Sequence, residues 1–436
     1  MMERTLPTGW MWTTLGDVAV VSPRDPALVF GAQFVTMSAV EVGSRHPVSY
    51  EQRGSRAGVR ARGNDVLFAR ITPCLENGKV ALLPPDAPPT GGSTEFIVIR
   101  PTSAVDPVFL YYWCLHPDVR DDAQHQMAGV TGRMRLAGSD LSKFDFPLPP
   151  IAEQRRIVEV LEDHLSRLDV AEQGVSDVHR RTSRLVRRLI ASRVGCPWPA
   201  HWSVRTVAEA GRIDLGRQRH PDWHDGEHMR PYLRVANVFE DRLDLSDVME
   251  MDFPPEVFER FRLVPGDILL NEGQSPHLLG RPAMYRGNPP EIAFTNSLIR
   301  FRAVEDVLPE WALMVFRHYM HSGRFTKEVR ITTNIAHLSV NRFKTIEFPV
   351  PPTIEQQAIL SALERDLEQA RRLETGLPTI RSKSAALRRS LLRAAFNGEL
   401  VDQDPTDEPA DLTLATIKDQ QPSGVPRRSR KAVAAN

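Results

Sequence analysis

Hydrophobic residues recur every seven positions in two segments, near residues 151–193 and 353–397. The first segment carries two such series, which are Leu161, Leu168, Val175, Thr182 and Leu189, and Ile157, His164, Ala171, Val178 and Leu185. The second segment repeats them 202 residues later as Leu363, Ala370, Leu377, Ser384 and Leu391, and Ile359, Asp366, Leu373, Ile380 and Leu387. Eight of the ten positions are apolar in each copy. This sustained heptad pattern predicts a coiled coil, whereas a helix lying on its own globule is the alternative.

Helix-breaking residues interrupt both segments near their midpoints. Gly174 lies in the first segment, and Gly376-Leu377-Pro378 lies at the equivalent place in the second. A proline inside a helix costs about 3 kcal/mol, so we expect a local break at Pro378. Two helices of this length, packed antiparallel, would hold two globules apart and relate them by an approximate two-fold axis.

The regions before each helical segment have short apolar runs punctuated by Gly and Pro, which predict buried strands. In the first region the expected strands are 66–69, 80–83 and 96–99, followed by a helix at 107–116. In the second they are 267–270 and 297–301, followed by a helix at 310–321. The predicted class is α+β. The predicted division is a globule at 1–148, a helix at 149–195, a globule at 196–350, a helix at 351–401 and a disordered polar tail at 402–436.

The two halves are similar in sequence as well as in pattern. Phe146-Pro147-Leu148-Pro149-Pro150-Ile151-Ala152-Glu153-Gln154 returns as Phe348-Pro349-Val350-Pro351-Pro352-Thr353-Ile354-Glu355-Gln356. The same register relates pairs upstream, among them Asp65/Asp267, Gly78/Gly280 and Arg100/Arg302. A period near 200 residues is too long for a solenoid repeat and indicates a duplicated module. We expect its partner to have two similar halves too.

Composition narrows the class of protein. The 436 residues are 41% hydrophobic and 25% charged, as in an ordinary soluble globular protein. No apolar run is long enough for a membrane span, and the N-terminus does not resemble a secretory signal. The three cysteines are widely spaced, so we expect a reducing cytoplasm. The net charge is zero, which leaves nucleic-acid binding to local basic patches.

Motifs for catalysis are missing from the sequence. Asn288-Pro289-Pro290 is followed by Glu291 and not by the aromatic residue of an amino-methyltransferase. There is no phosphate-binding glycine loop, and Glu76 and Lys79 lack the spacing of a nuclease metal site. His220, His224 and His228 have helical spacing, but Pro221 and Gly226 would break that helix. We therefore expect no catalytic and no metal site.

Basic and amide side chains instead gather in segments that read as loops. Arginine reads guanine, asparagine and glutamine read adenine, and lysine holds phosphates. The candidates for DNA contact are Arg70, Lys79, Arg133 and Arg135 in the first globule and Gln274, Arg281, Thr333 and Asn334 in the second. Solvated surface loops are the alternative for any single residue. The basic tail Pro426–Lys431 either touches phosphates without specificity or has no role.

From residue 1 to about 401 the chain resembles the DNA specificity subunit of type I restriction–modification systems. The resemblance is carried by the doubled Pro-Pro-x-x-Glu-Gln motif at Pro149–Gln154 and Pro351–Gln356 and by Ala395–Leu400 at the end of the second helix. Ile71–Lys79 and Ser93–Phe96 resemble a target recognition domain of that family. The resemblance covers nearly the whole chain, and Gly376-Leu377-Pro378 departs from an unbroken second helix.

The resemblance implies a non-catalytic subunit. Residues 1–148 and 196–350 would be target recognition domains, each reading one half of a bipartite double-stranded DNA site, and the helices would form an antiparallel coiled coil that sets the gap. Two methyltransferase subunits and two motor-nuclease subunits would be partners, and they would bind S-adenosylmethionine, ATP and Mg²⁺. The loops at 70–79 and 271–281 differ, so an asymmetric target is expected. The alternatives are a coiled-coil scaffold that ignores DNA and a self-sufficient methyltransferase or nuclease, for which residues are lacking.

Overall fold

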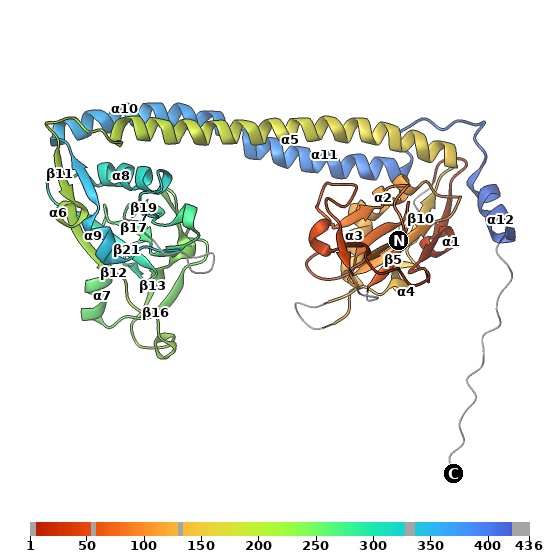
Figure 1. Cartoon of the computed structure of the whole chain (residues 1–436), viewed down its shortest axis with the longest axis horizontal. Helices are drawn as coiled ribbons and strands as arrows, with labels where there is room; N and C mark the ends of the chain where they lie inside the picture. Colours follow the sequence, from red (N-terminus) through yellow and green to blue (C-terminus); the bar gives the residue numbers. More distant parts are fainter. Residues whose placement is uncertain (1–5, 54–57, 130–133, 328–335, 421–436) are drawn as a thin grey trace, which may run out of the picture. The chain divides into compact units, whose positions relative to one another are not determined.

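The computed structural model describes residues 6–53, 58–129, 134–327 and 336–420. The chain divides into two compact units, which are Met1–Gly174 with Thr379–Asn436 (unit 1) and Val175–Pro378 (unit 2). Each unit combines one globule with parts of both helical segments (Figure 1). Each globule combines mostly antiparallel sheets, with one parallel strand pair in each, and short helices, which confirms the predicted α+β class and the pair of similar globules.

Unit 1 contains two four-stranded sheets and one short strand pair. The first sheet has the order β2 (Ala19–Val21), β9 (Phe96–Pro101), β6 (Val66–Ala69) and β7 (Val80–Leu82). The second has the order β4 (Glu51–Arg53), β3 (Ala32–Val35), β8 (Thr90–Gly92) and β5 (Val59–Ala61). β1 (Met11–Thr14) pairs antiparallel with β10 (Asp145–Leu148). The helices of the globule are α1 (Leu15–Val18), η1 (Met37–Ala39), α2 (Pro107–Leu115), α3 (Pro117–His125) and α4 (Gly138–Leu141).

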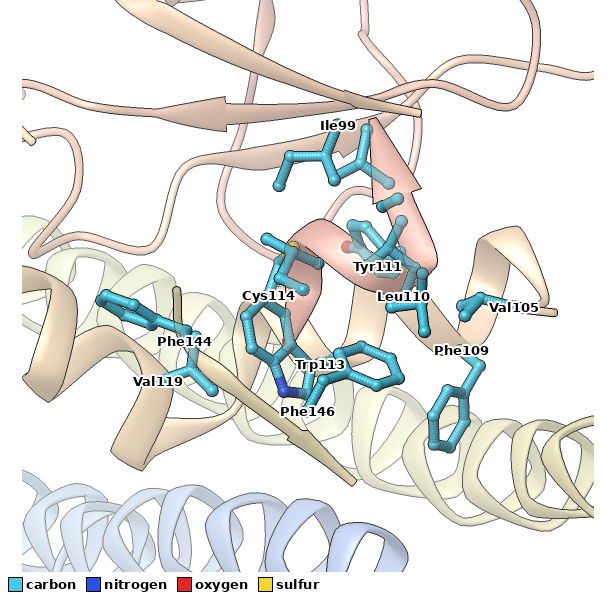
Figure 2. Packing of buried hydrophobic residues seen from close by; sticks show 14 of the residues in the cluster. Ile99, Val105, Phe109, Leu110, Tyr111, Trp113, Cys114, Val119, Phe144 and Phe146 are labelled. Carbon is cyan, nitrogen blue, oxygen red and sulfur yellow. The ribbon is translucent and has the colours of Figure 1, made fainter. Parts of the chain in front are cut away.

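Strand β6 and residues 96–99 of strand β9 are apolar, and both of their faces are covered. Val66 and Phe68 face one hydrophobic cluster, and Leu67 faces another. The first cluster surrounds α2, whose Phe109 and Trp113 are buried (Figure 2). A helix that is hydrophobic on all sides has to lie inside a core. The predicted strands at 66–69, 80–83 and 96–99 and the helix at 107–116 are confirmed within one or two residues.

Unit 2 repeats this plan with additional short elements. Its main sheet has the order β12 (Gly211–Leu215), β21 (Leu298–Ala303), β17 (Ile268–Asn271) and β19 (Pro282–Met284). The other strand groups are β16 (Met249–Asp252) with β13 (Met229–Leu233) and β20 (Ala293–Phe294), β14 (Val238–Phe239) with β15 (Arg242–Leu243), β18 (Gly273–Gln274) with β22 (Ala336–His337), and β11 (Ser203–Thr206) with β23 (Glu347–Val350). The globule's helices are α6 (Val207–Ala210), η2 (Pro221–Trp223), η3 (Val235–Asn237), α7 (Pro255–Phe261), η4 (Pro276–Leu278), α8 (Pro309–His321) and α9 (Val340–Thr345). The predicted strands at 267–270 and 297–301 and the helix at 310–321 are confirmed.

The long helices pair antiparallel within each unit. α5 (Ile151–Val194) continues through Gly174 without interruption, so the expected weakening there does not end the helix. In unit 1 it meets α11 (Leu377–Asn397), where Glu172 contacts Ser384 and Asp169 contacts Arg388. In unit 2 it meets α10 (Thr353–Glu374), where the His179 Nδ1–Glu374 Oε1 distance is 2.9 Å. Later residues of α5 therefore contact earlier residues of the second helical segment, as antiparallel pairing requires.

One of the two predicted apolar series forms the seam, and the other does not. Val175 and Thr182 on α5 and Ala370 and Ser384 on its partners are buried. The second predicted series is wrong beyond its first members, because its later side chains are exposed: Val178 39%, Leu185 43%, Leu373 58%, Ile380 45% and Leu387 49%. The positions that take its place in the seam each lie one residue later in the sequence, and on α5 they are Leu165, Glu172, His179 and Val186. Glu172 and His179 take ionic partners on the facing helices, which apolar periodicity could not reveal.

The predicted break in the second helical segment is confirmed. α10 ends at Glu374, α11 begins at Leu377, and Pro378 lies in the first turn of α11. Proline is tolerated in a first turn because its missing N–H would have no intrahelical acceptor there. The break therefore falls at Thr375 and Gly376, just before Pro378.

The prediction of a disordered tail from 402 is wrong for its first part. Residues Ala410–Gln420 form α12, and Ala410 and Leu414 are buried in the core of unit 1. The Arg156 Nη2–Asp407 Oδ2 ion pair at 2.6 Å and the Ala410 N–H bond to Gly9 O at 3.0 Å hold this segment. The polar composition of the segment suggested disorder, but its few apolar side chains have helical spacing and pack into the core of unit 1. The basic tail Pro426–Lys431 lies outside the described residues.

The duplicated Pro-Pro-x-x-Glu-Gln motif places an identical buried contact in each unit. The Gln154 side chain accepts from Asp106 N at 2.9 Å and donates to the carbonyl oxygens of Ala104 and Pro149, both at 2.9 Å. Gln356 accepts from Leu308 N at 2.9 Å and donates to Asp306 O at 2.9 Å and Pro351 O at 2.8 Å. Both glutamines are 0% exposed. Each amide joins the start of a long helix to the start of the globule's aromatic helix, α2 or α8.

Replacing Gln356 by alanine should destabilise unit 2 strongly. The change leaves one backbone N–H and two carbonyl oxygens without their partner in a buried site, and each such loss costs about 1–3 kcal/mol. We expect a loss of about 3 kcal/mol or more in the free energy of unfolding, measured by urea denaturation of the full chain with circular dichroism. Gln369→Ala, at an exposed position of the same helix, is the matched control. Equal losses from the two variants would contradict the role of the buried amide.

Candidate nucleic-acid interface

Loops that carry polar side chains leave one edge of the main sheet in each unit. In unit 1, β6 ends at Ala69, which is paired with Phe96 at the beginning of β9. β2 ends and β7 begins at the same edge, because both neighbours run antiparallel to the central strands. The segments 22–31, 70–79 and 93–95 therefore emerge together. In unit 2 the equivalent segments are 216–228, 272–281 and 295–297. We call each set the loop edge of its unit.

A three-segment junction stands at the loop edge of unit 1. Arg70 N donates to Glu95 O at 2.9 Å, and Leu136 N donates to Arg70 O at 2.9 Å. Ile71 and Arg135 form an isolated antiparallel bridge. The chain after β6, the chain before β9 and residues 134–136 are thus tied by their backbones. We call Arg70, Glu95 and Arg135 the first junction.

The side chains of the first junction form an ion pair at the surface. Arg135 Nη2 donates to Glu95 Oε1 at 2.7 Å, and its Nε donates to Glu95 Oε2 at 2.9 Å. The hydrogen bond from Arg135 lowers the pKa of Glu95, and the charges of Arg135 and Arg70 act in the same direction. The Arg135 side chain is 42% exposed, so solvent screens this pair. The junction offers the solvent mainly N–H donors.

Unit 2 builds the same backbone junction from different side chains. Glu272 N donates to Ser297 O at 3.0 Å, and Leu338 N donates to Glu272 O at 2.7 Å. Gly273 pairs with His337, as Ile71 pairs with Arg135. Every position lies 202 residues after its counterpart. We call Glu272, Ser297 and His337 the second junction.

The second junction offers an acceptor where the first offers donors. Glu272 replaces Arg70, Ser297 replaces Glu95 and His337 replaces Arg135. Glu272 Oε2 lies 3.2 Å from His337 Nδ1, and the Glu272 side chain is 27% exposed. A carboxylate accepts hydrogen bonds only. At the position of Arg70 and Glu272, the two copies of one backbone frame thus carry a donor in unit 1 and an acceptor in unit 2.

The structure brings some of the predicted DNA-contact residues to these junctions. Arg70 and Arg135 are members of the first, and Gln274 lies in β18 beside the second. Arg133, Thr333 and Asn334 lie outside the described residues. Lys79 and Arg281 stand at the far ends of the equivalent loops, where their carbonyl oxygens accept from Ala69 N and Asn271 N.

Lys79 and Arg281 are engaged within the protein. Lys79 Nζ donates to Met37 O at 2.9 Å. The Arg281 guanidinium lies 4.6 Å from the centre of the Phe239 ring, and burial lowers its pKa. Gln274 Oε1 accepts from Ser275 N at 3.0 Å and is half-buried. These three side chains therefore have contacts within the protein, and their contact with DNA stays a prediction.

Sequence reasoning missed Glu95, Glu272, Ser297 and His337. The candidates named from the sequence were basic, amide and hydroxyl side chains, and no acidic residue was among them. The missed signal was the register itself, because adding 202 to Arg70, Glu95 and Arg135 names the second junction directly. A comparison of equivalent positions would have found them.

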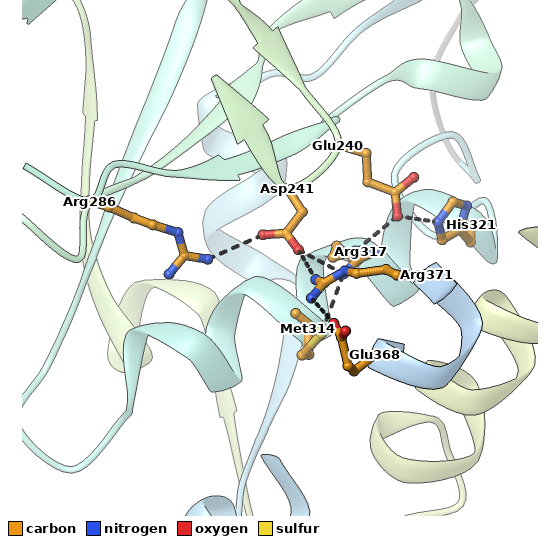
Figure 3. Close-up of polar contacts among 8 residues, drawn as sticks. All are labelled: Glu240, Asp241, Arg286, Met314, Arg317, His321, Glu368 and Arg371. Carbon is orange, nitrogen blue, oxygen red and sulfur yellow. Dashed lines mark hydrogen bonds and ion pairs between the residues drawn. The ribbon is translucent and has the colours of Figure 1, made fainter. Parts of the chain in front are cut away.

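An ionic network ties α10 to the globule of unit 2 (Figure 3). Glu240 Oε1 lies 2.8 Å from His321 Nε2 and 2.9 Å from Arg317 Nε. Asp241 Oδ2 lies 3.3 Å from Arg317 Nη1 and 3.5 Å from Arg371 Nη2 of α10. Burial alone would raise the pKa of Glu240, but the hydrogen bond from His321 and the charge of Arg317 outweigh it and lower the pKa to about 2. The network therefore keeps Glu240 ionised at neutral pH.

The part of the chain that the structure describes holds no group of three His, Cys, Asp or Glu side chains placed to share a metal ion. Nor does it hold a helix whose length and hydropathy would suit a membrane span.

Comparison with known proteins finds that parts of the chain are similar to DNA specificity proteins. The type I restriction modification DNA specificity domain matches residues 7–176. The EcoEI specificity subunit of Escherichia coli is 27% identical over 197 residues, which are 43% of this chain and 33% of that protein. The EcoKI specificity subunit of Escherichia coli (strain K12) is 22% identical over 357 residues, or 77% of this chain and 76% of that protein. The matched region thus spans a third of the first relative's length and three quarters of the second's.

A solved structure shares the fold over nearly the whole chain. It is described as the structural basis underlying complex assembly and conformational transition of the type I R-M system. It superposes with a TM-score of 0.69 at 22% identity, and covers 91% of this chain and 99% of that one.

Replacing Glu240 by glutamine should destabilise unit 2 in a pH-dependent way. The folded-state pKa of about 2 lies below the ordinary value of 4.5, so ionised Glu240 stabilises the fold above pH 4.5 and that contribution is lost as the pH falls toward 2. By linkage we expect Glu240→Gln to cost about 2–3 kcal/mol at pH 7 and progressively less below pH 4.5. Urea unfolding at several pH values between 7 and 3 measures the difference. The exposed Glu250→Gln should have no such effect, and a difference that did not vary with pH would contradict the assignment.

Proposed function

Because the chain is similar to type I restriction–modification specificity subunits, we propose that it is such a subunit, reads an asymmetric bipartite DNA site and recruits methyltransferase subunits to it. Each globule acts as one target recognition domain. The chain itself performs no chemistry. Its loop edges contact the DNA, and its helices connect the two recognition domains.

One observation carries this proposal above the others. The first and second junctions have the same backbone frame and stand at the same sheet edge, but a donor in the first, Arg70, is replaced by an acceptor in the second, Glu272. Duplication explains the common frame. Two copies that served only to pack against proteins would have no reason to exchange donors for acceptors at equivalent surface positions. Recognition of two different half-sites does provide a reason, because base edges differ in donors and acceptors.

The exposed apolar side chains of the helices support the docking of protein partners. Val178 and Leu185 on α5 and Leu373 on α10 are all more than a third exposed. Scattered exposed leucines are ordinary on a protein surface, but these recur at heptad spacing beside the seam. We assign this stripe to the methyltransferase subunits. Two such subunits and two motor-nuclease subunits complete the assembly, and they bind S-adenosylmethionine, ATP and Mg²⁺.

The test is methylation profiling of DNA exposed to the chain assembled with its methyltransferase partner. We expect one bipartite motif with two different half-sites and a constant gap. Binding of random duplexes by the same complex should weaken steeply with salt, because phosphate contacts release counterions. A complex that bound its protein partner without DNA affinity would indicate a scaffold instead. Methyl transfer by the purified chain alone would indicate an enzyme.

Lengthening both helical segments should lengthen the gap in the target without changing either half-site. Seven residues inserted after Gly174 and seven after Gly376 keep the heptad register and add about 10 Å of helix. That length corresponds to about three base pairs of B-DNA at 3.4 Å each. Methylation profiling of the variant complex measures the gap. The same insertion at 174 alone is the control, since helices of unequal length should impair assembly. An unchanged gap in the double-insertion variant would contradict the role of the helices as a spacer.

A further inference from the structure

We propose that the two junctions read bases of opposite hydrogen-bonding character, the first a guanine and the second a base with an exocyclic amino group, cytosine or adenine. This inference rests on the proposed function and names the residues that determine specificity. Arg135 is the reader in the first half-site and Glu95 positions it. Glu272 is the reader in the second half-site and His337 positions it.

The geometry of Arg135 leaves the guanine-reading edge of its guanidinium open. Glu95 occupies the side of the group that carries Nε and Nη2. Among the described residues, Nη1 has no hydrogen-bond partner, so the Nη1–Nη2 end remains available. Two parallel N–H groups at that end match the O6 and N7 acceptors of guanine. A carboxylate bound along one side holds the plane of the guanidinium while the end contacts the base.

Arg70 supports the pair of Glu95 and Arg135 through its backbone and its charge. Its backbone binds both Glu95 and Leu136, and its charge contributes to the lowered pKa of Glu95. The guanidinium is half-buried, and its Nε has no partner among the described residues. The local surplus of positive charge suits the phosphates that flank a base in the groove.

Glu272, the counterpart of Arg70, presents an acceptor in the second junction. Oε2 faces His337 Nδ1 at 3.2 Å, and Oε1 has no partner among the described residues. A carboxylate oxygen that is partly exposed and oriented by a neighbour can accept from cytosine N4 or adenine N6. The same carboxylate would repel phosphate and would leave guanine O6 without a donor. The second junction therefore selects for an amino group and against guanine.

Substitutions in the first junction separate base reading from phosphate contact. Arg135→Ala should reduce discrimination at one position of the first half-site by about ten- to a hundredfold, and leave the second half-site unchanged. Arg135→Lys keeps the charge but loses the planar fork, so it should lose the same discrimination. Glu95→Gln should give an intermediate loss at that same position, and the exposed Arg389→Ala is the control. Methylation profiling of each variant complex measures the preference.

Substitutions in the second junction should act on the other half-site alone. Glu272→Ala should relax one cytosine or adenine position by about tenfold or more, and His337→Ala should do so partially. The identity of the relaxed base distinguishes cytosine from adenine. The exposed Glu250→Ala should leave both half-sites as they are. Because all of these side chains lie at the surface, thermal melting should show little change.

The outcomes separate this inference from the proposed function. If the wild-type complex yields no bipartite motif, the proposed function fails. If the motif exists but the variants keep every base preference, or weaken binding to all sequences alike, the inference is overturned. If Arg135→Ala weakened binding to all sequences and Arg135→Lys restored it, Arg135 would be a phosphate contact, which needs only the charge, and the inference would be overturned.

Discussion

The buried amide of a single glutamine at the start of each long helix is the constraint on which the rest of the structure depends. It satisfies one N–H and two carbonyl groups where the chain leaves a strand, turns through two prolines and enters the helix. The N–H belongs to the start of α2 in unit 1 and of α8 in unit 2. Each helix therefore has a defined exit direction from its globule. Without this bond the turn would bury three unpaired polar groups, which the fold could not tolerate cheaply.

A second repeated contact holds the main sheets in the same form. Arg100 pairs with the buried carboxylate of Asp65 at 2.7 Å, and Arg302 pairs with that of Asp267 at 2.6 Å. Each pair joins the turn before a central strand to the strand beside it, so the loop edges at the opposite ends of these strands inherit a common geometry. Duplication thus preserved what supports the loops. The loops themselves diverged, since surface side chains with few packing neighbours can change at little cost.

The helices show how polar residues can specify a pairing. Thr182 and Ser384 lie buried in the seam, and Glu172 meets Ser384 and Arg388 across it. Leucines at these positions would pair the helices more tightly but would also permit sliding by a heptad. Polar side chains with particular partners disfavour a shifted register, because the shift would leave them unpaired. The apolar stripe beside the seam stays exposed.

The sequence by itself determined the duplication, the α+β class, the central strands, the two aromatic helices and the break before Pro378. These features depend on local periodicity, on burial of continuous apolar runs and on the stereochemistry of proline, all of which are visible in neighbouring residues. Only the tertiary structure decided which residues of α5 face the partner helix. The heptad pattern fits two sets of positions that differ by one residue, and the contacts of Glu172 and His179 with the facing helices identify the set that is used. The tertiary structure also decided that residues 410–420 fold as α12, because the groove that buries Leu414 is built by distant parts of the chain. The junctions are the same case: Arg70, Glu95 and Arg135 are far apart in sequence and meet only through strand pairing.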